Sequence, residues 1–199
     1  MRMPPEVRAA ESEDAPSIRL PLAIVSLLVS LPMLFLGGLI GIDFDGWWHV
    51  FIARQVPWEE FWRDVERNAH PPLFYLLLRM VAQLGSERLL YRSLSIVAAV
   101  IATYAVGAIA ARVLRRRQLS PLCALAFGLA VQTAIMACAV RSYMVSLAFL
   151  LIAFPFYLDL IDPRRRQVDA RTRIAFALAV PALYAALDRG YRRWRSQRR

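Results

Sequence analysis

Two aspartates follow the first apolar segment of the chain, in the sequence "GIDFDGWWHVF" of residues 41–51. A positioned carboxylate can take the proton of a hydroxyl group while that hydroxyl attacks a substrate, so Asp43 and Asp45 are candidate catalytic residues. The alternative is that both acids form the solvated end of a helix, because an acid at the boundary of a membrane span costs little free energy.

Further polar residues stand at the ends of later apolar segments, and each has a functional and a structural interpretation. His70 precedes a double proline and is either a functional group or a turn residue that caps the next helix. Arg92 and Arg141 can bind phosphate oxygens in a bidentate manner. The structural alternative for both arginines is an anchoring role at the membrane interface.

The apolar segments that must position these residues are long enough to cross a membrane. Residues 20–42 contain no charge, and about 20 apolar residues span the hydrocarbon core. We therefore predict an all-α polytopic membrane protein with about four transmembrane helices. The predicted spans cover residues 20–42, 93–112, 119–140 and 143–160.

Arginine clusters give these spans an orientation. Arg115–Arg117 and Arg164–Arg166 lie one helical hairpin apart, and basic residues concentrate on the cytoplasmic side of a membrane. The polar tail of residues 1–19, which we expect to be disordered, is then cytoplasmic, while the segment 43–91 and Arg141 face outward. The net charge of +10 reflects this topology. We predict no nucleic-acid partner, because no reader motif accompanies the charge.

The outer loop, residues 43–91, is expected to carry interfacial helices instead of a slack connection. An apolar stripe at helical spacing suits either the membrane interface or packing on the protein. Its members are Trp58, Phe61, Trp62 and Val65. Pro72 suits the first position of a following helix, which is short and interrupted by Arg79.

The basic C-terminal region, residues 161–199, contains an apolar segment at 174–187 that is short for a span. Crossing there would place the arginine-rich end of the chain outside. We expect a surface helix on anionic lipid, with the alternative that the chain is the beginning of something longer.

Taken together, these residues resemble the GT-C superfamily of membrane glycosyltransferases, in particular its protein mannosyltransferase and aminoarabinose transferase-like branch. The resemblance covers about residues 20–160 and rests on the acidic pair, a loop helix, "HPPLFYLLLR", "RSLSIVAAV" and "RSY". Such enzymes are integral membrane proteins that move a sugar from a polyprenyl-phosphate carrier to an acceptor on the outer face. The resemblance implies a bacterial inner-membrane enzyme whose acceptor is a glycan, a lipid or a protein.

The resemblance also gives the acids a role. Asp45 matches the first acid of the family's loop motif, which deprotonates the acceptor hydroxyl or helps to hold a metal ion. Gly46 stands where the second acid is usual, and Asp43 is a substitute with a D-x-D spacing. A divalent metal, if one is used, would be held by Asp43 and Asp45.

The remaining candidate residues are expected to bind the substrate and the lipid phosphate. His70 matches the residue before the family's double proline, and Arg141 with Tyr143 matches its R-x-Y element. Arg141 and Arg92 are the candidates for the phosphate of the carrier.

Two other classes of function stay open at this point. Members of the family are usually longer and carry further spans. A truncated, non-catalytic membrane protein or partner subunit that retains the first half of the fold is therefore the alternative. A small transporter is the third possibility, for which charges inside the membrane should line a path.

Overall fold

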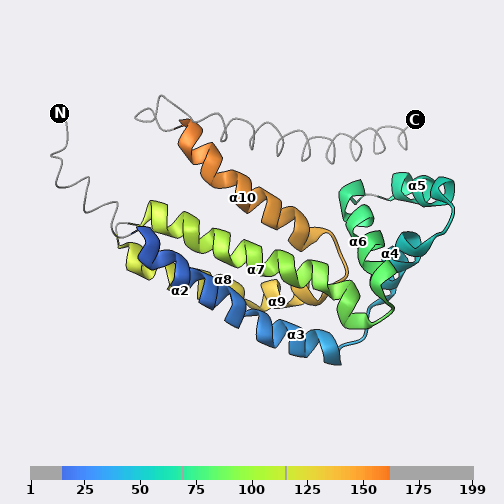
Figure 1. Cartoon of the computed structure of the whole chain (residues 1–199), viewed down its shortest axis with the longest axis horizontal. Helices are drawn as coiled ribbons and strands as arrows, with labels where there is room; N and C mark the ends of the chain where they lie inside the picture. Colours follow the sequence, from blue (N-terminus) through green and yellow to red (C-terminus); the bar gives the residue numbers. More distant parts are fainter. Residues whose placement is uncertain (1–14, 69, 115, 162–199) are drawn as a thin grey trace.

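The computed structural model describes residues 15–68, 70–114 and 116–161, and every regular element within these ranges is a helix (Figure 1). The prediction of an all-α fold is confirmed for this part of the chain. Two helical segments, Ile18–Leu39 and Arg88–Val113, are long and apolar enough to cross a membrane. That finding is compatible with an integral membrane protein. The C-terminal region predicted from residue 162 onward, including the segment 174–187, lies outside the described residues.

The first predicted span consists of two helices, α2 (Ala15–Leu28) and α3 (Ser30–Leu39), which are interrupted at Val29. Pro32 has no amide hydrogen, so the carbonyl of Leu28 loses its helical partner at this point. The helix also begins earlier than predicted, because residues 15–19, assigned to the disordered tail, are helical.

The central helix is α7 (Arg88–Val113), which packs against α2, α3, α8, α9 and α10 (Figure 1). It begins five residues before the predicted span at 93, so that Arg92 lies within the helix. Its buried face consists largely of small residues, among them Ala99, Ala102 and Gly107. Small residues let helix backbones approach closely in a membrane. At Gly107 a β-carbon would lie only 2.4 Å from Cδ2 of Leu22.

The third predicted span is also broken. The short 3₁₀ turn η1 (Arg117–Leu119) leads into α8 (Ser120–Gly128), and α9 (Val131–Cys138) follows at an angle of 57°. The chain then forms α10 (Tyr143–Ile161), whose apolar part is shorter than a full span. In the described residues, two helices, or three if the bent pair is one span, meet the length for crossing. The predicted count of four is thus not confirmed.

The predicted outer loop forms three helices beside the start of α7: α4 (Phe44–Arg54), α5 (Trp58–Arg67) and α6 (Pro72–Leu84) (Figure 1). On α5, Phe61 and Val65 are buried, whereas Trp58 and Trp62 are exposed, so the apolar stripe is divided between protein and surroundings. Arg79 of α6 donates to the carbonyls of Ala53 and Gln55 at the end of α4. This contact accounts for the charge within an otherwise apolar helix.

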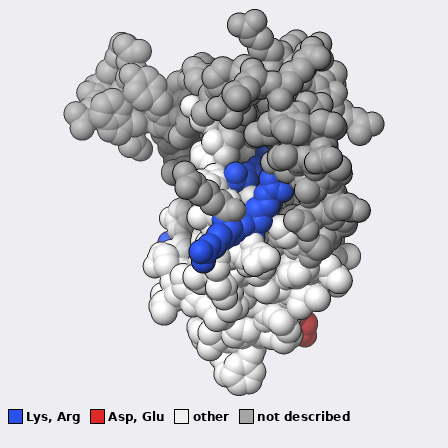
Figure 2. Space-filling view, turned by 90° about the vertical axis from the view of Figure 1, so that its left-hand side faces the viewer, with Lys and Arg blue, Asp and Glu red and all other residues white. Residues whose placement is uncertain are grey.

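An arginine cluster and the acidic pair lie at opposite ends of the helices. Figure 2 shows arginine side chains gathered at the end where α7 stops and α8 begins. The described arginines of that stretch are Arg112, Arg116 and Arg117. The acidic pair and Arg141 lie at the other end, where α3 stops and α10 begins (Figure 1).

Candidate functional site

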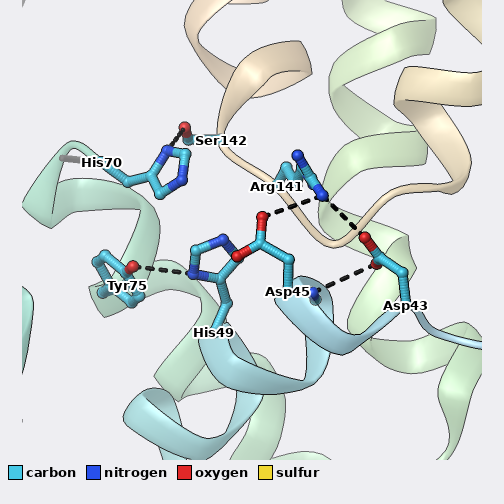
Figure 3. Close-up of polar contacts among 8 residues, drawn as sticks. Asp43, Asp45, His49, His70, Tyr75, Arg141 and Ser142 are labelled. Atoms are coloured by element: carbon cyan, nitrogen blue, oxygen red, sulfur yellow. Dashed lines mark hydrogen bonds and ion pairs between the residues drawn. The ribbon is translucent and has the colours of Figure 1, made fainter. Parts of the chain in front are cut away.

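Asp43 and Asp45 meet Arg141, a residue of the loop between α9 and α10 (Figure 3). The Nη2 atom of Arg141 lies 2.8 Å from Oδ2 of Asp43 and 3.0 Å from Oδ2 of Asp45. The side chains of Arg141 and Asp45 are 28% and 49% exposed, so the ion pair is open to a ligand. Asp43 and Arg141 are 98 positions apart in the sequence, and the fold brings them together.

Asp43 has a structural role as well. It is the N-cap of α4, and its Oδ1 accepts a hydrogen bond of 3.3 Å from the backbone N–H of Gly46. Such a bond satisfies one of the free amides of the first helical turn. The helix-end interpretation is therefore correct for Asp43, which caps the helix with one oxygen and contacts Arg141 with the other.

Gly46, where the resemblance led us to expect an acid, has no room for a side chain. A β-carbon there would lie 2.7 Å from Oδ1 of Asp43 and 2.8 Å from Cγ2 of Ile42. Neither distance is tolerable between non-bonded atoms. Within this geometry, the second carboxylate of the site comes from Asp43, and the capping position that it occupies excludes an acid at position 46.

Arg92 takes a different place from the one predicted. Its side chain is 1% exposed, and its Nε donates to the carbonyl of Cys138 at 2.7 Å, at the end of α9. The terminal nitrogens donate to the carbonyls of Gly37, Ile40 and Gly41, at the end of α3. The prediction that Arg92 binds the carrier phosphate is not supported. Arg92 is also not an anchor at the membrane interface, because it is buried and ties the end of α3 to the end of α9, next to Asp43 and Arg141.

His70 is brought into the site by a contact across the fold. Its Nδ1 lies 2.9 Å from Oγ of Ser142, and its ring stands edge-on to that of Tyr143 at 5.7 Å between centroids. The turn that starts α6 has Pro71 at the N-cap, without a side-chain cap. The capping interpretation of His70 is thus wrong, while the predicted neighbours His70, Arg141 and Tyr143 do lie together.

Sequence reasoning missed His49 and its partner Tyr75. His49 is buried on α4, and its Nδ1 lies 2.9 Å from the hydroxyl of Tyr75 on α6 (Figure 3). The rings of His49 and His70 meet edge to face at 4.6 Å. A signal for His49 was present, because it follows Asp45 by four positions and so shares its helix face. Tyr75 and Ser142 enter the site only through tertiary packing.

The electrostatics favour the charged form of Asp43 and the neutral form of both imidazoles. Burial acts to raise the pKa of Asp43, but the hydrogen bond and charge of Arg141 outweigh it and lower that pKa. The hydrogen bond of Asp43 in turn raises the pKa of Arg141. Burial, with the charge of Arg141 adding to it, lowers the pKa of His70. Burial and the neighbouring His70 lower the pKa of His49 to about 4.

The described residues do not form a metal site. No group of three or more His, Cys, Asp and Glu side chains within them is arranged to hold a metal ion. Asp43 and Asp45 each direct one oxygen at Nη2 of Arg141, and a divalent ion bound by both carboxylates would compete with that guanidinium. The ligand set therefore does not fit the divalent metal considered from the sequence.

Comparison of the chain with protein-family models, with curated proteins and with solved structures finds no match. The site combines an accessible carboxylate, a guanidinium and two neutral imidazoles. A carboxylate can accept a proton, and a guanidinium can bind an anionic leaving group. These are the elements required for attack by a hydroxyl on a phosphate-activated substrate.

Proposed function

We propose that this chain is a membrane glycosyltransferase of the GT-C type, transferring a sugar from a polyprenyl-phosphate-linked donor to an acceptor hydroxyl. The observation that carries the proposal is the contact between Asp45 and Arg141, which pairs an accessible base with a phosphate-binding group. The sequence motifs around both residues support the same class of enzyme.

The proposed reaction is a single inverting displacement. The acceptor oxygen attacks the anomeric carbon of the donor sugar, and its proton passes to the carboxylate of Asp45. The bond from the anomeric carbon to the phosphate oxygen breaks, and polyprenyl phosphate leaves with the bonding electrons. Arg141 stabilises the charge that develops on this phosphate, as a positioned cation does for a charged leaving group. Tyr143 and His70 line the same region and would contact the substrate.

The two ends of the molecule suggest how it lies in the membrane. The arginine-rich end around Arg116 and Arg117 would face the cytoplasm, following the distribution of basic residues in membrane proteins. The N-terminus would then also be cytoplasmic. The site around Asp45 would open at the outer face of the bacterial inner membrane, where polyprenyl-linked sugars are used by the family that the chain resembles.

The test is an assay for release of polyprenyl phosphate, the product that is common to every acceptor. The purified protein in lipid nanodiscs is supplied with polyprenyl-phosphate mannose, glucose or aminoarabinose and with a membrane extract as acceptor source. We expect Asp45→Asn to lower the release rate by about 10²-fold or more, because the amide cannot accept the proton.

The matched control is Glu60→Gln, which removes an exposed acid from α5, away from Arg141. It should leave the rate unchanged. Equal rates for the wild type and Asp45→Asn would eliminate Asp45 as the base. Failure of the wild-type protein to release polyprenyl phosphate from any of the three donors would favour the non-catalytic membrane partner.

A further inference from the structure

His49 carries a buried nitrogen that has no hydrogen-bond partner. The residue is 1% exposed, and Nε2 of its ring is unpaired although it is shielded from solvent. A buried polar atom without a partner loses its hydrogen bonds to water and gains none in return. A group left in this condition inside a polar cluster calls for a functional explanation.

The contact with Tyr75 bears on which ring nitrogen of His49 carries the hydrogen. The phenol is fully buried, and its hydroxyl lies 2.9 Å from Nδ1 of His49. A buried hydroxyl must donate its hydrogen to an acceptor, and the lone pair of a neutral imidazole is such an acceptor. When Tyr75 donates to Nδ1, the ring hydrogen resides on Nε2. The unpaired atom is therefore a hydrogen-bond donor in search of an acceptor.

The nearest acidic group on the same helix is Asp45, one turn before His49. Oδ2 of Asp45 contacts Arg141 at 3.0 Å. Figure 3 shows the second oxygen of this carboxylate turned toward the imidazole of His49. The charge of Asp45 also acts on the titration of both His49 and Tyr75. Residues four apart on a helix are neighbours, so a side-chain rotation brings carboxylate and imidazole into contact.

We propose that His49 is a positioning residue, whose Nε2–H takes over the Asp45 carboxylate when an anionic phosphate group occupies Arg141. This inference rests on the proposed function, since it assigns the phosphate of the lipid carrier as the anion. In the ligand-free protein Asp45 is held by Arg141, and in the complex it is held by His49.

The exchange follows from competition for one nitrogen. Nη2 of Arg141 already binds Asp43 and Asp45, so a phosphate oxygen at this nitrogen displaces a carboxylate. The displaced Asp45 would otherwise lie beside the phosphate with no donor to fix its orientation. A neutral imidazole N–H supplies that donor without cancelling the negative charge. The carboxylate is thus oriented to accept the proton of the attacking hydroxyl.

The first test observes the hydrogen bond without any ligand. The chain has two histidines, so protein labelled with ¹⁵N-histidine gives a spectrum in which both rings can be assigned with His49→Gln. We expect wild-type His49 to carry its hydrogen on Nε2. Replacement of Arg141 by Met should release Asp45 and shift the Nε2–H resonance downfield. The double variant Arg141→Met, Asp45→Asn should lose that shift. A hydrogen on Nδ1, or an unshifted resonance in Arg141→Met, overturns the proposal.

The same shift should appear when the wild-type protein is titrated with a short-chain prenyl phosphate. Inorganic phosphate serves as the probe for an anion without a lipid. Both should produce the shift if the anion alone drives the exchange, and only the prenyl phosphate should do so if the lipid is needed to place it. An unchanged His49 resonance with both probes overturns the exchange.

A pair of substitutions then tests the role in turnover. The amide nitrogen of Gln reaches the position of Nε2, whereas that of Asn reaches only the position of Nδ1. His49→Gln should therefore keep most of kcat, and His49→Asn should lose about 10²-fold in kcat with little change in KM. Both variants should melt at similar temperatures. Equal activity of the two variants contradicts the proposal, while failure of the proposed function appears separately, as absence of polyprenyl phosphate release by the wild type.

Discussion

Two arginines at the same end of the molecule show how differently one residue type can be used. Arg92 is buried within the helix bundle and binds backbone carbonyls at the ends of α3 and α9. Arg141 lies on the loop after α9, partly exposed, and binds the carboxylates of Asp43 and Asp45. The partners of Arg92 are fixed parts of the fold, whereas those of Arg141 are side chains that can rotate.

The difference between the two arginines is that Arg92 supports the structure of the site, whereas Arg141 is available for its chemistry. Carbonyl groups at helix ends need donors in a membrane, where water cannot satisfy them. Arg92 meets this requirement for two helices at once and so sets the distance between the segments bearing Asp43 and Arg141. The ion pairs of Arg141 join side chains only, so we expect the fold to depend on them less than on the contacts of Arg92.

The largest expected effect comes from removing Arg92. The Arg92→Met variant leaves several buried carbonyls without a donor, and each unsatisfied group costs about 1–3 kcal/mol. We expect a loss of at least about 3 kcal/mol in the free energy of unfolding. Thermal unfolding in nanodiscs is the measurement. Arg141→Met is the control and should cost less than about 1 kcal/mol, as for exposed ion pairs. Equal losses would remove the distinction between the two arginines.

An intermediate effect is expected at Gly46. The Gly46→Ala variant places a methyl group against Oδ1 of Asp43 and Cγ2 of Ile42. We expect about 1–3 kcal/mol of destabilisation, together with a lower rate of polyprenyl phosphate release, because Asp43 must leave its cap. Gly38→Ala is the matched control on α3, since a β-carbon there meets no atom within 4 Å. Alanine is the better helix former, so the control should be neutral or stabilising. A neutral Gly46→Ala would show that Asp43 does not need its present position.

The smallest expected effect is the pH dependence of stability that comes from His49, a residue of the candidate site. The pKa of His49 is lowered to about 4 in the folded protein. As the pH falls below about 6.5, His49 therefore becomes protonated in the unfolded chain but stays neutral in the folded protein. Stability is therefore complete above about pH 6.5 and falls as the pH decreases toward 4. His49 contributes at most about 1.4 kcal/mol per pH unit within this window.

Unfolding of the wild type and His49→Gln at pH 7 and at pH 5.5 measures this contribution. The difference between the two proteins should shrink or reverse at the lower pH, because Gln does not titrate. His70 and Asp43, whose pKa values are lowered as well, contribute acid sensitivity to both proteins. A pH-independent difference would place the source of acid sensitivity away from His49.

The parts of the fold that depend on local sequence were predictable. The uncharged run of residues 20–42 indicated the first membrane helix, and Pro72 marked the start of α6. The breaks at Val29 and after Gly128 were not predicted, because hydropathy reports the length of an apolar segment and not the continuity of its hydrogen bonds. The apolar part of α10 is shorter than a full span. This was missed for a related reason, because an apolar composition does not show how much of a segment forms one helix.

The candidate site was predictable only where residue type and motif agreed. Asp43, Asp45, His70 and Arg141 were found from their placement at the ends of apolar segments, and Tyr143 was found from the R-x-Y element of the resemblance. The structure brings these residues together. The sequence position of Arg92 is compatible both with phosphate binding and with an anchoring role, so the sequence alone did not distinguish the two. The hydrogen bonds of Arg92 to the carbonyls of Cys138 and Ile40, which are distant in sequence, show that its role is structural. The pairing of His49 with Tyr75 likewise depends on the packing of α4 against α6.

The two broken helices have a consequence for the synthesis of the protein. The break at Val29 contacts the end of α8, where a β-carbon on Gly128 would lie 2.8 Å from Cγ2 of Val29. Val29 is 1% exposed, whereas Leu129, within the second break, is 55% exposed. During translation α2 and α3 are made long before α8. The contact that buries the break at Val29 therefore forms only after α8 has been synthesised.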